Sequence, residues 1–399
     1  MSPAITTRSI PARVFAFLAS FGLAVVVLSF LLLLTWLGTL EQTKMGIYDV
    51  QRKYFDSLFC IYELGFLKIP LPGVYLLLGI LFVNLLCGGL IRIRKDWRHI
   101  GIIIAHFSIL FLIVAGWVSY HFKDDGHLQL FHGQSSNVFT SYHNRLIEVA
   151  EAGGREPVLI IREGKFDDCT GSKKRTFFNK NLPFEITLSN YLKNCDGVAA
   201  EMRPPPAGAP VINGFYLSPR EAEKQAEANL AGAVVSLKDA KSGSETPALL
   251  WEAALAPVTY KSADGRTFTV KLTRERWELP FTVTLNRFNH EYHPGTQRPK
   301  LFESEITKRE DGIDQDAKIE MNKPLRRRGY TLFQASWGPP NWTPQMGRDK
   351  LYSVFAVVKN PSDAWPIYAL ITAAFGLLVH FCMKLSAAIN RAAKRESAL

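Results

Sequence analysis

The stretch IGIIIAHFSILFLIVAGW, residues 100–117, decides the architecture of this chain. It is apolar almost throughout and, extended to residue 120, has the length of about 20 residues that a helix needs to cross a bilayer. One titratable side chain, His106, lies inside it. An imidazole in hydrocarbon is costly unless it has a partner, so His106 is a candidate functional residue.

Three other apolar blocks are about as long. The sequence predicts four transmembrane helices over residues 14–38, 71–91, 100–120 and 365–383. The first block is too long for the h-region of a signal peptide, and no small-x-small cleavage site follows it. We therefore expect it to be an uncleaved anchor.

Basic residues mark one side of the membrane. Segments 1–13, 92–99 and 384–399 carry ten basic and two acidic residues in all. Four alternating helices place these segments on one side, which the positive-inside rule predicts to be the cytoplasm. Both termini would then be cytoplasmic. The net charge of +11 reflects this orientation and gives no reason to expect nucleic acid as a partner.

Two segments remain for the outer side. In segment 39–70, aromatic and aliphatic side chains recur at helical spacing from Tyr48 to Phe66, which predicts a helix on the outer membrane face or one packed on the larger domain. Segment 121–364 is a domain in its own right. The predicted fold class is an α+β membrane protein, with four transmembrane helices and a large, antiparallel, β-rich extracytoplasmic domain between helices three and four.

The large outer segment reads mostly as strands. TYKSADGRTFTVKL has a hairpin signal at Asp264-Gly265, and FTVTLNRF, KLFESEITK and YTLFQASW alternate. One helix is predicted over residues 218–232, with Ser218 as its cap. LPFEITLSNY (182–191) is similar to LPFTVTLNRF (279–288), which indicates two related β-layers or a chance similarity of amphipathic strands.

A second histidine, His380, lies in the inner half of the fourth block, at a depth similar to that of His106. Imidazole is a common axial ligand of haem iron, and a flat apolar macrocycle suits a site between helices. His106 is therefore a candidate haem ligand and His380 a candidate second one. The alternatives are a hydrogen bond to a neighbouring helix for His106 and contact with the headgroups for His380.

The remaining candidates are weaker. His290 and His293 lack the four-residue spacing of a helical zinc motif and are typical of loop or surface residues. His121 follows the third helix at the outer surface, with nothing local to support a site. Cys169 and Cys195 face the oxidising side and could pair across a short loop. C-x-x-C-H is absent, so the chain is not itself a c-type cytochrome.

Several pieces of the sequence resemble the ResB-like (CcsB-like) family of cytochrome c biogenesis. They are GTLEQ, YFDSL, LFVNLLCGGLIR, GIIIAHFSILFLIVAG, VTLNRFNHEYHPGTQRPKLFESEI, NKPLRRRGYTLFQASW and VVKNPSDAWPIYALITAAFGLL. NKPLRRRGYTLFQASW is the most specific piece. Residues 195–275 match no part of the family pattern, so their role is open.

The resemblance implies a System II haem-handling protein of a bacterial-type inner (plasma) membrane. Such a protein works with a ResC/CcsA-type membrane partner to carry haem outward and join it to apocytochrome c. His106 would be an axial ligand of transient, non-covalent b-type haem, whereas His380 lies outside the family pattern. The chain would be a non-catalytic subunit of a cytochrome c synthase (holocytochrome c lyase-type) complex. A thiol-reducing, thioredoxin-like protein is a further expected partner.

Two other functions stay open. A membrane-anchored receptor or scaffold with a β-rich binding domain would need no haem, but it leaves the match of NKPLRRRGYTLFQASW unexplained. A membrane oxidoreductase would keep b-type haem bound and cycle its redox state.

Overall fold

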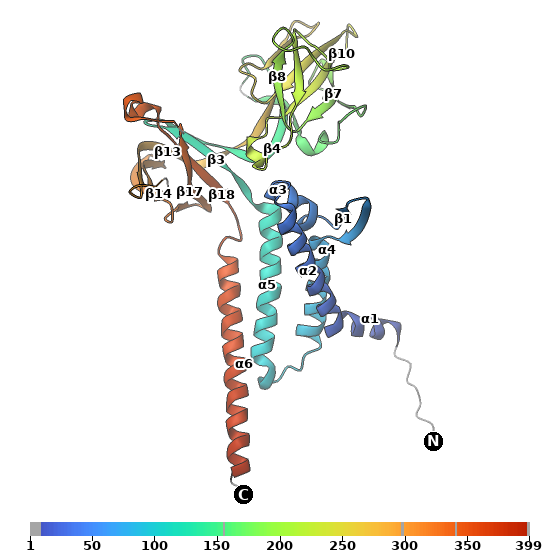
Figure 1. Ribbon diagram of the computed structural model, residues 1–399, viewed down its shortest axis with the longest axis vertical. Coiled ribbons are helices and arrows are strands. Elements are labelled where there is room, and N and C mark those ends of the chain that lie inside the picture. Colours follow the sequence, from blue (N-terminus) through green and yellow to red (C-terminus); the bar gives the residue numbers. More distant parts are fainter. Residues whose placement is uncertain (1–8, 155, 297–298, 340, 397–399) are drawn as a thin grey trace. The chain divides into compact units, whose positions relative to one another are not determined.

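The structure divides into two units (Figure 1). It is a computed structural model and describes residues 9–154, 156–296, 299–339 and 341–396. The first unit combines residues 1–123 with residues 360–399, and the second comprises residues 124–359. The first is mostly helical and the second consists mainly of antiparallel strands. The predicted combination of apolar helices with a large antiparallel β-region is confirmed.

Within the described residues, four helical segments are long and apolar enough to cross a membrane: Phe21–Glu41, Val74–Ile91, Trp97–Phe122 and Trp365–Arg395. The elements that form them are α2 (Phe21–Glu41), α4 (Val74–Asn84) with the π-helical turn η2 (Leu85–Ile91), the 3₁₀ turn η3 (Trp97–His99) with α5 (Ile100–Phe122), and α6 (Trp365–Glu396). Each predicted span has its helical counterpart. The side of the membrane on which each end lies stays a prediction.

The helix ends differ from the predicted ones in two places. A short helix, α1 (Ile10–Leu18), ends before α2, because the Ser20 Oγ accepts a hydrogen bond from the Leu23 N–H at 3.2 Å and caps α2. The first apolar block is therefore broken rather than continuous over residues 14–38. At the other end, α6 continues through the predicted basic tail to Glu396, because alanine and basic residues favour helix there.

Segment 39–70 is only partly helical. A helical stretch consists of α3 (Ile47–Val50) and the π-helical turn η1 (Gln51–Phe55), and an antiparallel hairpin of β1 (Phe59–Leu64) and β2 (Leu67–Pro72) follows. The predicted helix is thus wrong beyond Phe55. Gly65 has a φ of +61° and allows the two-residue turn between the strands, a conformation that glycine adopts at little cost.

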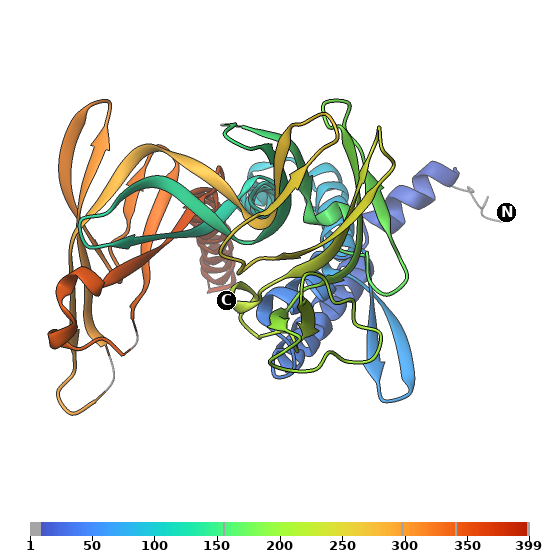
Figure 2. The same cartoon turned by 90° about the horizontal axis from the view of Figure 1, so that it is seen from above.

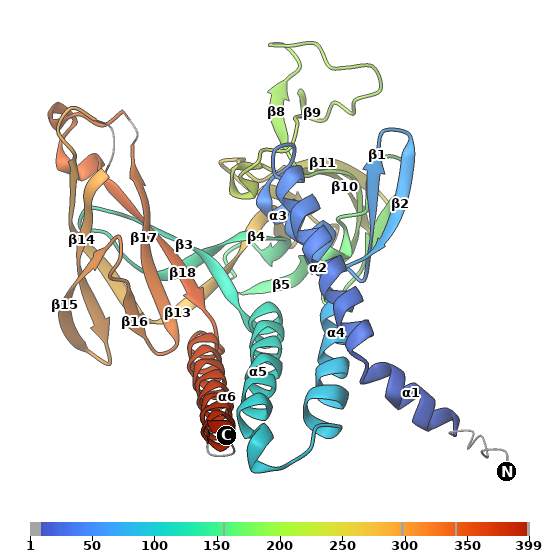
Figure 3. The same ribbon diagram turned by 60° about the horizontal axis from the view of Figure 1, so that its bottom comes forward.

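The second unit contains sixteen described strands, all paired antiparallel (Figure 2). They are β3 (Asp124–Phe131), β4 (Ser135–Glu151), β5 (Pro157–Arg162), β6 (Arg175–Phe177), β7 (Phe184–Leu192), β8 (Cys195–Ala199), β9 (Phe215–Pro219), β10 (Gly232–Asp239), β11 (Glu245–Trp251), β12 (Val258–Lys261), β13 (Thr267–Tyr292), β14 (Pro299–Glu310), β15 (Ile313–Glu320), β16 (Leu325–Arg327), β17 (Tyr330–Gly338) and β18 (Tyr352–Lys359). The largest sheet has the order β15-β14-β13-β4-β3-β18-β17-β16, with β12 beside β13 and β5 beside β4. A second sheet has the order β11-β10-β7-β6. The strands β8 and β9 form a separate hairpin (Figure 3).

These strands enclose two hydrophobic cores, and β4 and β13 contribute to both. The first core contains Phe184, Ile186 and Leu188 of β7, and the second contains Phe281, Val283 and Leu285 of β13. The two similar stretches, 182–191 and 279–288, therefore provide one alternating strand to each core. Each stretch thus belongs to a different β-layer, and whether the two layers are related or similar by chance stays open.

The helix predicted over residues 218–232 is wrong. Ser218 lies in β9, a single 3₁₀ turn, η5 (Ala226–Ala228), follows, and Gly232 begins β10. The Asn229 side chain accepts a hydrogen bond from the Glu223 N–H at 2.8 Å, and its carbonyl accepts from distant arginines. These long-range bonds replace the local ones of a helix, so tertiary contacts override helix propensity here.

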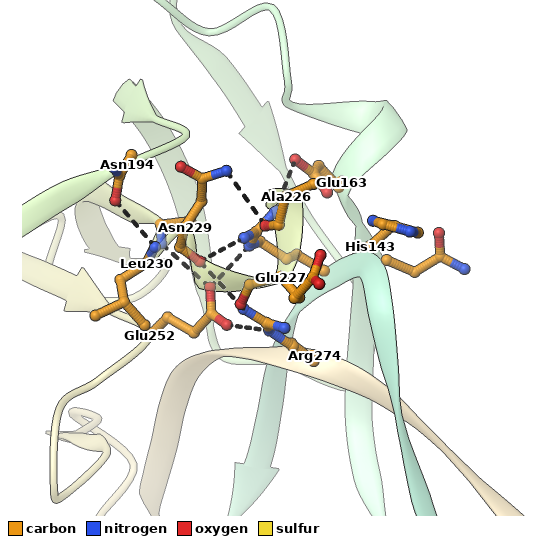
Figure 4. Close-up of polar contacts among 12 residues, drawn as sticks. His143, Glu163, Asn194, Ala226, Glu227, Asn229, Leu230, Glu252 and Arg274 are labelled. Carbon is orange, nitrogen blue, oxygen red and sulfur yellow. Dashed lines mark hydrogen bonds and ion pairs between the residues drawn. The ribbon is translucent and has the colours of Figure 1, made fainter. Parts of the chain in front are cut away.

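Glu252 anchors this segment to the long strands (Figure 4). Arg145 of β4 and Arg274 of β13 face each other across the strand pair, where like charges repel. The Glu252 Oε2 accepts a hydrogen bond from the Arg145 Nε at 2.7 Å, and its Oε1 accepts one from the Arg274 Nε. Both guanidinium groups also donate to the Asn229 carbonyl, at 2.8 and 3.1 Å. Burial alone would raise the pKa of Glu252, but the two arginines outweigh it and hold that pKa below its ordinary value.

The motif NKPLRRRGYTLFQASW forms the hairpin of β16 and β17. Arg328 and Gly329 make its two-residue turn, both with positive φ, at 47° and 79°. The Lys308 Nζ and the Arg327 Nε lie 2.9 and 2.7 Å from the Glu310 Oε2, and Arg328 pairs with the other oxygen. The basic run of the motif, together with Lys308, therefore surrounds the Glu310 carboxylate of β14. Those hydrogen bonds lower the pKa of Glu310 to about 2.

We expect Glu252→Gln to destabilise the second unit by about 3–5 kcal/mol, because two largely buried arginines lose the carboxylate that they share. The change is measured as the urea midpoint of the detergent-solubilised full-length protein. Unfolding is monitored by the hydrogen exchange of peptides from β4 and β13. Glu278→Gln, an exposed position on β13, is the control. Equal midpoints for the two variants would contradict the role given to Glu252.

We expect the stability of the second unit to fall as the pH drops from 4.5 to about 2. The pKa of Glu310 is lower in the folded state than its ordinary 4.5, so its contribution is complete above pH 4.5 and is lost as the carboxylate protonates. Urea midpoints at pH 6 and pH 3 measure the effect, and Glu310→Gln should reduce their difference. An undiminished difference in the variant would assign the acid sensitivity to other groups.

Candidate functional site

His106 lies in α5 with one ring nitrogen bound and the other available. Its Nδ1 is 2.8 Å from the carbonyl oxygen of Ile102, one turn earlier. A carbonyl only accepts, so Nδ1 carries the proton and Nε2 presents its lone pair when the ring is neutral. Within the described part of the chain, Nε2 has no hydrogen-bond partner. The half-buried imidazole is therefore held in the tautomer that a metal ligand needs.

Gly89 of η2 makes room for this ring. A Cβ built on Gly89 would lie 2.6 Å from the His106 Cδ2 and 2.8 Å from its Cγ, so a larger residue would force the imidazole to move. The neighbouring Gly88 packs against the break between α1 and α2, where a Cβ would lie 3.1 Å from the Ala19 carbonyl oxygen. The π-turn, closed by the Arg92 N–H on the Cys87 carbonyl at 2.9 Å, is a rare geometry that occurs often at functional sites.

His380 packs on another side of α5. A Cβ on Gly101 would lie 2.6 Å from the Gly376 carbonyl oxygen and 2.9 Å from the His380 Cα, so α5 and α6 touch closely there. Gly101 and His106 are five residues apart, which places them about 140° apart around the helix axis. The contacts of the two histidines thus lie on different faces of α5. His380 as a second ligand stays a prediction.

An apolar groove of about 730 Å³ lies on the face of α5 that carries His106. It is lined by Gln51, Phe55, Asp56, Val74, Tyr75, Leu78, Gly79, Phe82, Leu112, Ile113, Val114, Gly116, Trp117 and Tyr120. Ile113, Trp117 and Tyr120 follow His106 by 7, 11 and 14 residues and therefore lie within about 40° of it around the helix. The groove extends this face toward the C-terminal end of α5.

An aromatic cluster closes that end of the groove. The Trp117 Nε1 donates to the Tyr75 hydroxyl at 3.1 Å, and this hydroxyl is 3.2 Å from the His121 Nε2. The His121 ring also lies 4.8 Å from the Trp117 ring and 4.9 Å from the Tyr120 ring. No local pattern had supported a site at His121. Its four-residue spacing from Trp117 was the signal that could have placed them together.

Among the described residues, His290 and His293 belong to no group of three potential metal ligands. His290 lies in β13 rather than in a loop, and its ring stacks on Trp337 at 4.4 Å. Burial lowers the pKa of His290 below its ordinary value. His293 follows the end of β13. Among the described residues, no group of three potential metal ligands occurs.

Cys169 and Cys195 are both buried and free in this structure, and their pairing stays a prediction. Cys169 belongs to the first core, and the Cys195 Sγ lies where a Cβ on Gly232 would be 2.5 Å away. Burial raises the pKa of the Cys195 thiol to about 12, which makes it unreactive.

Comparison with known proteins finds a family match for one part of the chain. Residues 256–349 match the model of the ResB-like family. The chain is also 35% identical over 86 residues to the cytochrome c biogenesis protein CcsB of Synechococcus sp. (strain CC9902), and 37% identical over 85 residues to that of Synechococcus sp. (strain CC9605). These alignments cover 22% and 21% of this chain and 20% and 18% of the relatives, so the chain spans about a fifth of their length. The resemblance to the ResB-like (CcsB-like) family is thereby confirmed over this part.

We expect Gly89→Ala to destabilise the helical unit by about 1–3 kcal/mol, because the added methyl overlaps the His106 ring. The thermal unfolding midpoint of the detergent-solubilised protein measures the change. Gly79→Ala in α4 is the matched control, since no atom lies within 4 Å of its ideal Cβ. Equal midpoints would show that the ring moves away from Gly89 without cost.

Proposed function

We propose, on the premise of a ResB-like resemblance, that this protein acts in cytochrome c biogenesis and carries haem through the membrane as a transient, non-covalently held cargo. The observation that supports this function best is the imidazole of His106. Its Nδ1 is bound to the Ile102 carbonyl, and its Nε2 is available as a neutral nitrogen ligand. Neutral imidazole is a common axial ligand of haem iron.

The surroundings of His106 fit such a cargo. The hydrogen bond to Ile102 fixes the orientation and tautomer of the ring, as second-shell partners of metal-bound histidines do. Gly89 leaves the ring space that any larger residue would fill. The groove beyond it offers aromatic rings, including Tyr75 and Trp117, to a flat apolar macrocycle.

The same face of α5 suggests a direction of transfer. His106 lies roughly 10 Å from the basic end of α5, which the sequence predicts to be cytoplasmic, and Trp117 lies about 16 Å further along the axis. Haem bound at His106 would thus be in the inner half of the membrane, and the groove would lead it toward the outer half.

The rest of the reaction belongs to partners in this proposal. A ResC/CcsA-type membrane protein would supply the second axial ligand, unless His380 does so. Apocytochrome c would receive the haem, and a thioredoxin-like protein would keep its thiols reduced. This chain would be a non-catalytic subunit of the resulting cytochrome c synthase complex. The second unit, with its large sheet, would bind the partner, the apocytochrome or both.

The absorption spectrum of the purified full-length protein in detergent tests the proposal. We expect the wild type, co-expressed with its candidate partner, to retain haem with a Soret band, and His106→Ala to lose this co-purifying haem. His380→Ala, made with and without the partner, decides whether both ligands come from one chain. His132→Ala, an exposed position in the second unit, is the control.

Other outcomes separate the alternatives. Haem retained unchanged in His106→Ala would contradict the proposed ligand. The absence of haem under every condition, with haem supplied, would favour a scaffold. Haem that remains bound and cycles redox state after partner and apocytochrome are added would favour an oxidoreductase.

A further inference from the structure

A second histidine occupies the start of the same helix. His99 ends η3, directly before α5, and its Nδ1 lies 2.5 Å from the Asp96 Oδ1. Its side chain is 34% exposed. Within the described residues, the Nε2 of His99 has no hydrogen-bond partner. His99 and His106 thus share one arrangement, in which a partner three or four residues earlier holds Nδ1 and leaves Nε2 available.

The two imidazoles lie at different levels along the axis of α5. His99 directly precedes α5 and His106 lies seven residues later, which at about 1.5 Å per residue separates them by roughly 10 Å along the axis. Two imidazoles separated in this way would hold haem at two positions rather than at one.

The residues around His99 suit the other parts of a haem. The propionates of haem are carboxylates, and α5 itself contains no Lys or Arg that could pair with them. Arg94 of the preceding loop, which lies 3.9 Å from Asp96, and Arg98 of η3 are both exposed, and Trp97 of η3 is 85% exposed. Guanidinium groups bind carboxylates well, and an indole face suits a flat macrocycle.

We propose that His99, oriented by Asp96, is a separate haem-binding position at the basic end of α5, from which haem passes to His106. The inference rests on the proposed function and adds a position to it. The Asp96 carboxylate on Nδ1 orients the His99 imidazole, as carboxylate partners of metal-bound histidines do.

Haemin titration of the full-length His106→Ala protein isolates this position. We expect the variant, which is isolated without co-purified haem, to bind one equivalent of added haemin with the electron paramagnetic resonance signal of an imidazole-ligated ferric haem. Adding His99→Gln should abolish this signal, because glutamine can still donate to Asp96 but does not ligate iron as imidazole does. Adding Asp96→Asn should weaken binding about tenfold. Adding His132→Ala should change nothing.

The outcomes distinguish the two proposals. An imidazole signal that persists in the His106→Ala, His99→Gln protein, or no imidazole-ligated haemin in His106→Ala when the wild type binds it, would overturn the His99 position and leave the role of His106 intact. No binding by the wild type itself, with or without partner, would overturn both. A purely structural role for the Asp96–His99 pair would alter the thermal midpoint of Asp96→Asn without changing the haemin affinity.

Discussion

The close approach of α5 to its neighbours at three glycines is the constraint on which the helical unit depends. In lipid, apolar side chains gain little by leaving their surroundings, so helices associate where small residues let their backbones touch. Gly101 and Gly376 bring α5 and α6 together in this way. Gly89 uses the same freedom differently, because its missing side chain admits an imidazole instead of a second helix backbone. Small residues thus both position α5 against α6 and make room for the His106 ring.

Ser29, Thr35 and His106 of the apolar helices each bond to the backbone carbonyl four residues earlier in the same helix. Ser29 and Thr35 each donate to the carbonyl four residues earlier, at 2.9 and 2.8 Å, which satisfies the hydroxyl within its own helix. His106 does the same with Nδ1. A histidine has a second nitrogen, however, so the local bond satisfies its donor and leaves an acceptor. The residue is stable enough in hydrocarbon to persist, and it retains the atom that a metal would bind.

Sequence reasoning identified the features that depend on composition and missed those that depend on distant partners. The four apolar spans follow from length and hydropathy, and His106 stands out because a titratable group is rare there. The break before Ser20 was missed, because hydropathy averages over a cap inside an apolar run. The helix expected around residues 218–232 has good local signals, and its absence results from bonds to Arg145 and Arg274 that no local pattern reveals. The same holds for Gly89, whose contact with His106 joins two separate helices.

The strand β13 changes the face it buries as it passes from one core to the other. Phe268 and Val270 are buried in the first core, whereas Phe281 and Val283 are buried in the second, so even positions point inward in one and odd positions in the other. The pairing with β4 shifts between Arg274 and Arg276 and again between Glu278 and Val283, and these irregularities reset the alternation. The number of residues of β13 between the two cores therefore determines which side chains face each core. Removing a single residue there would keep both halves of the strand intact and still turn the apolar side chains of one core toward water.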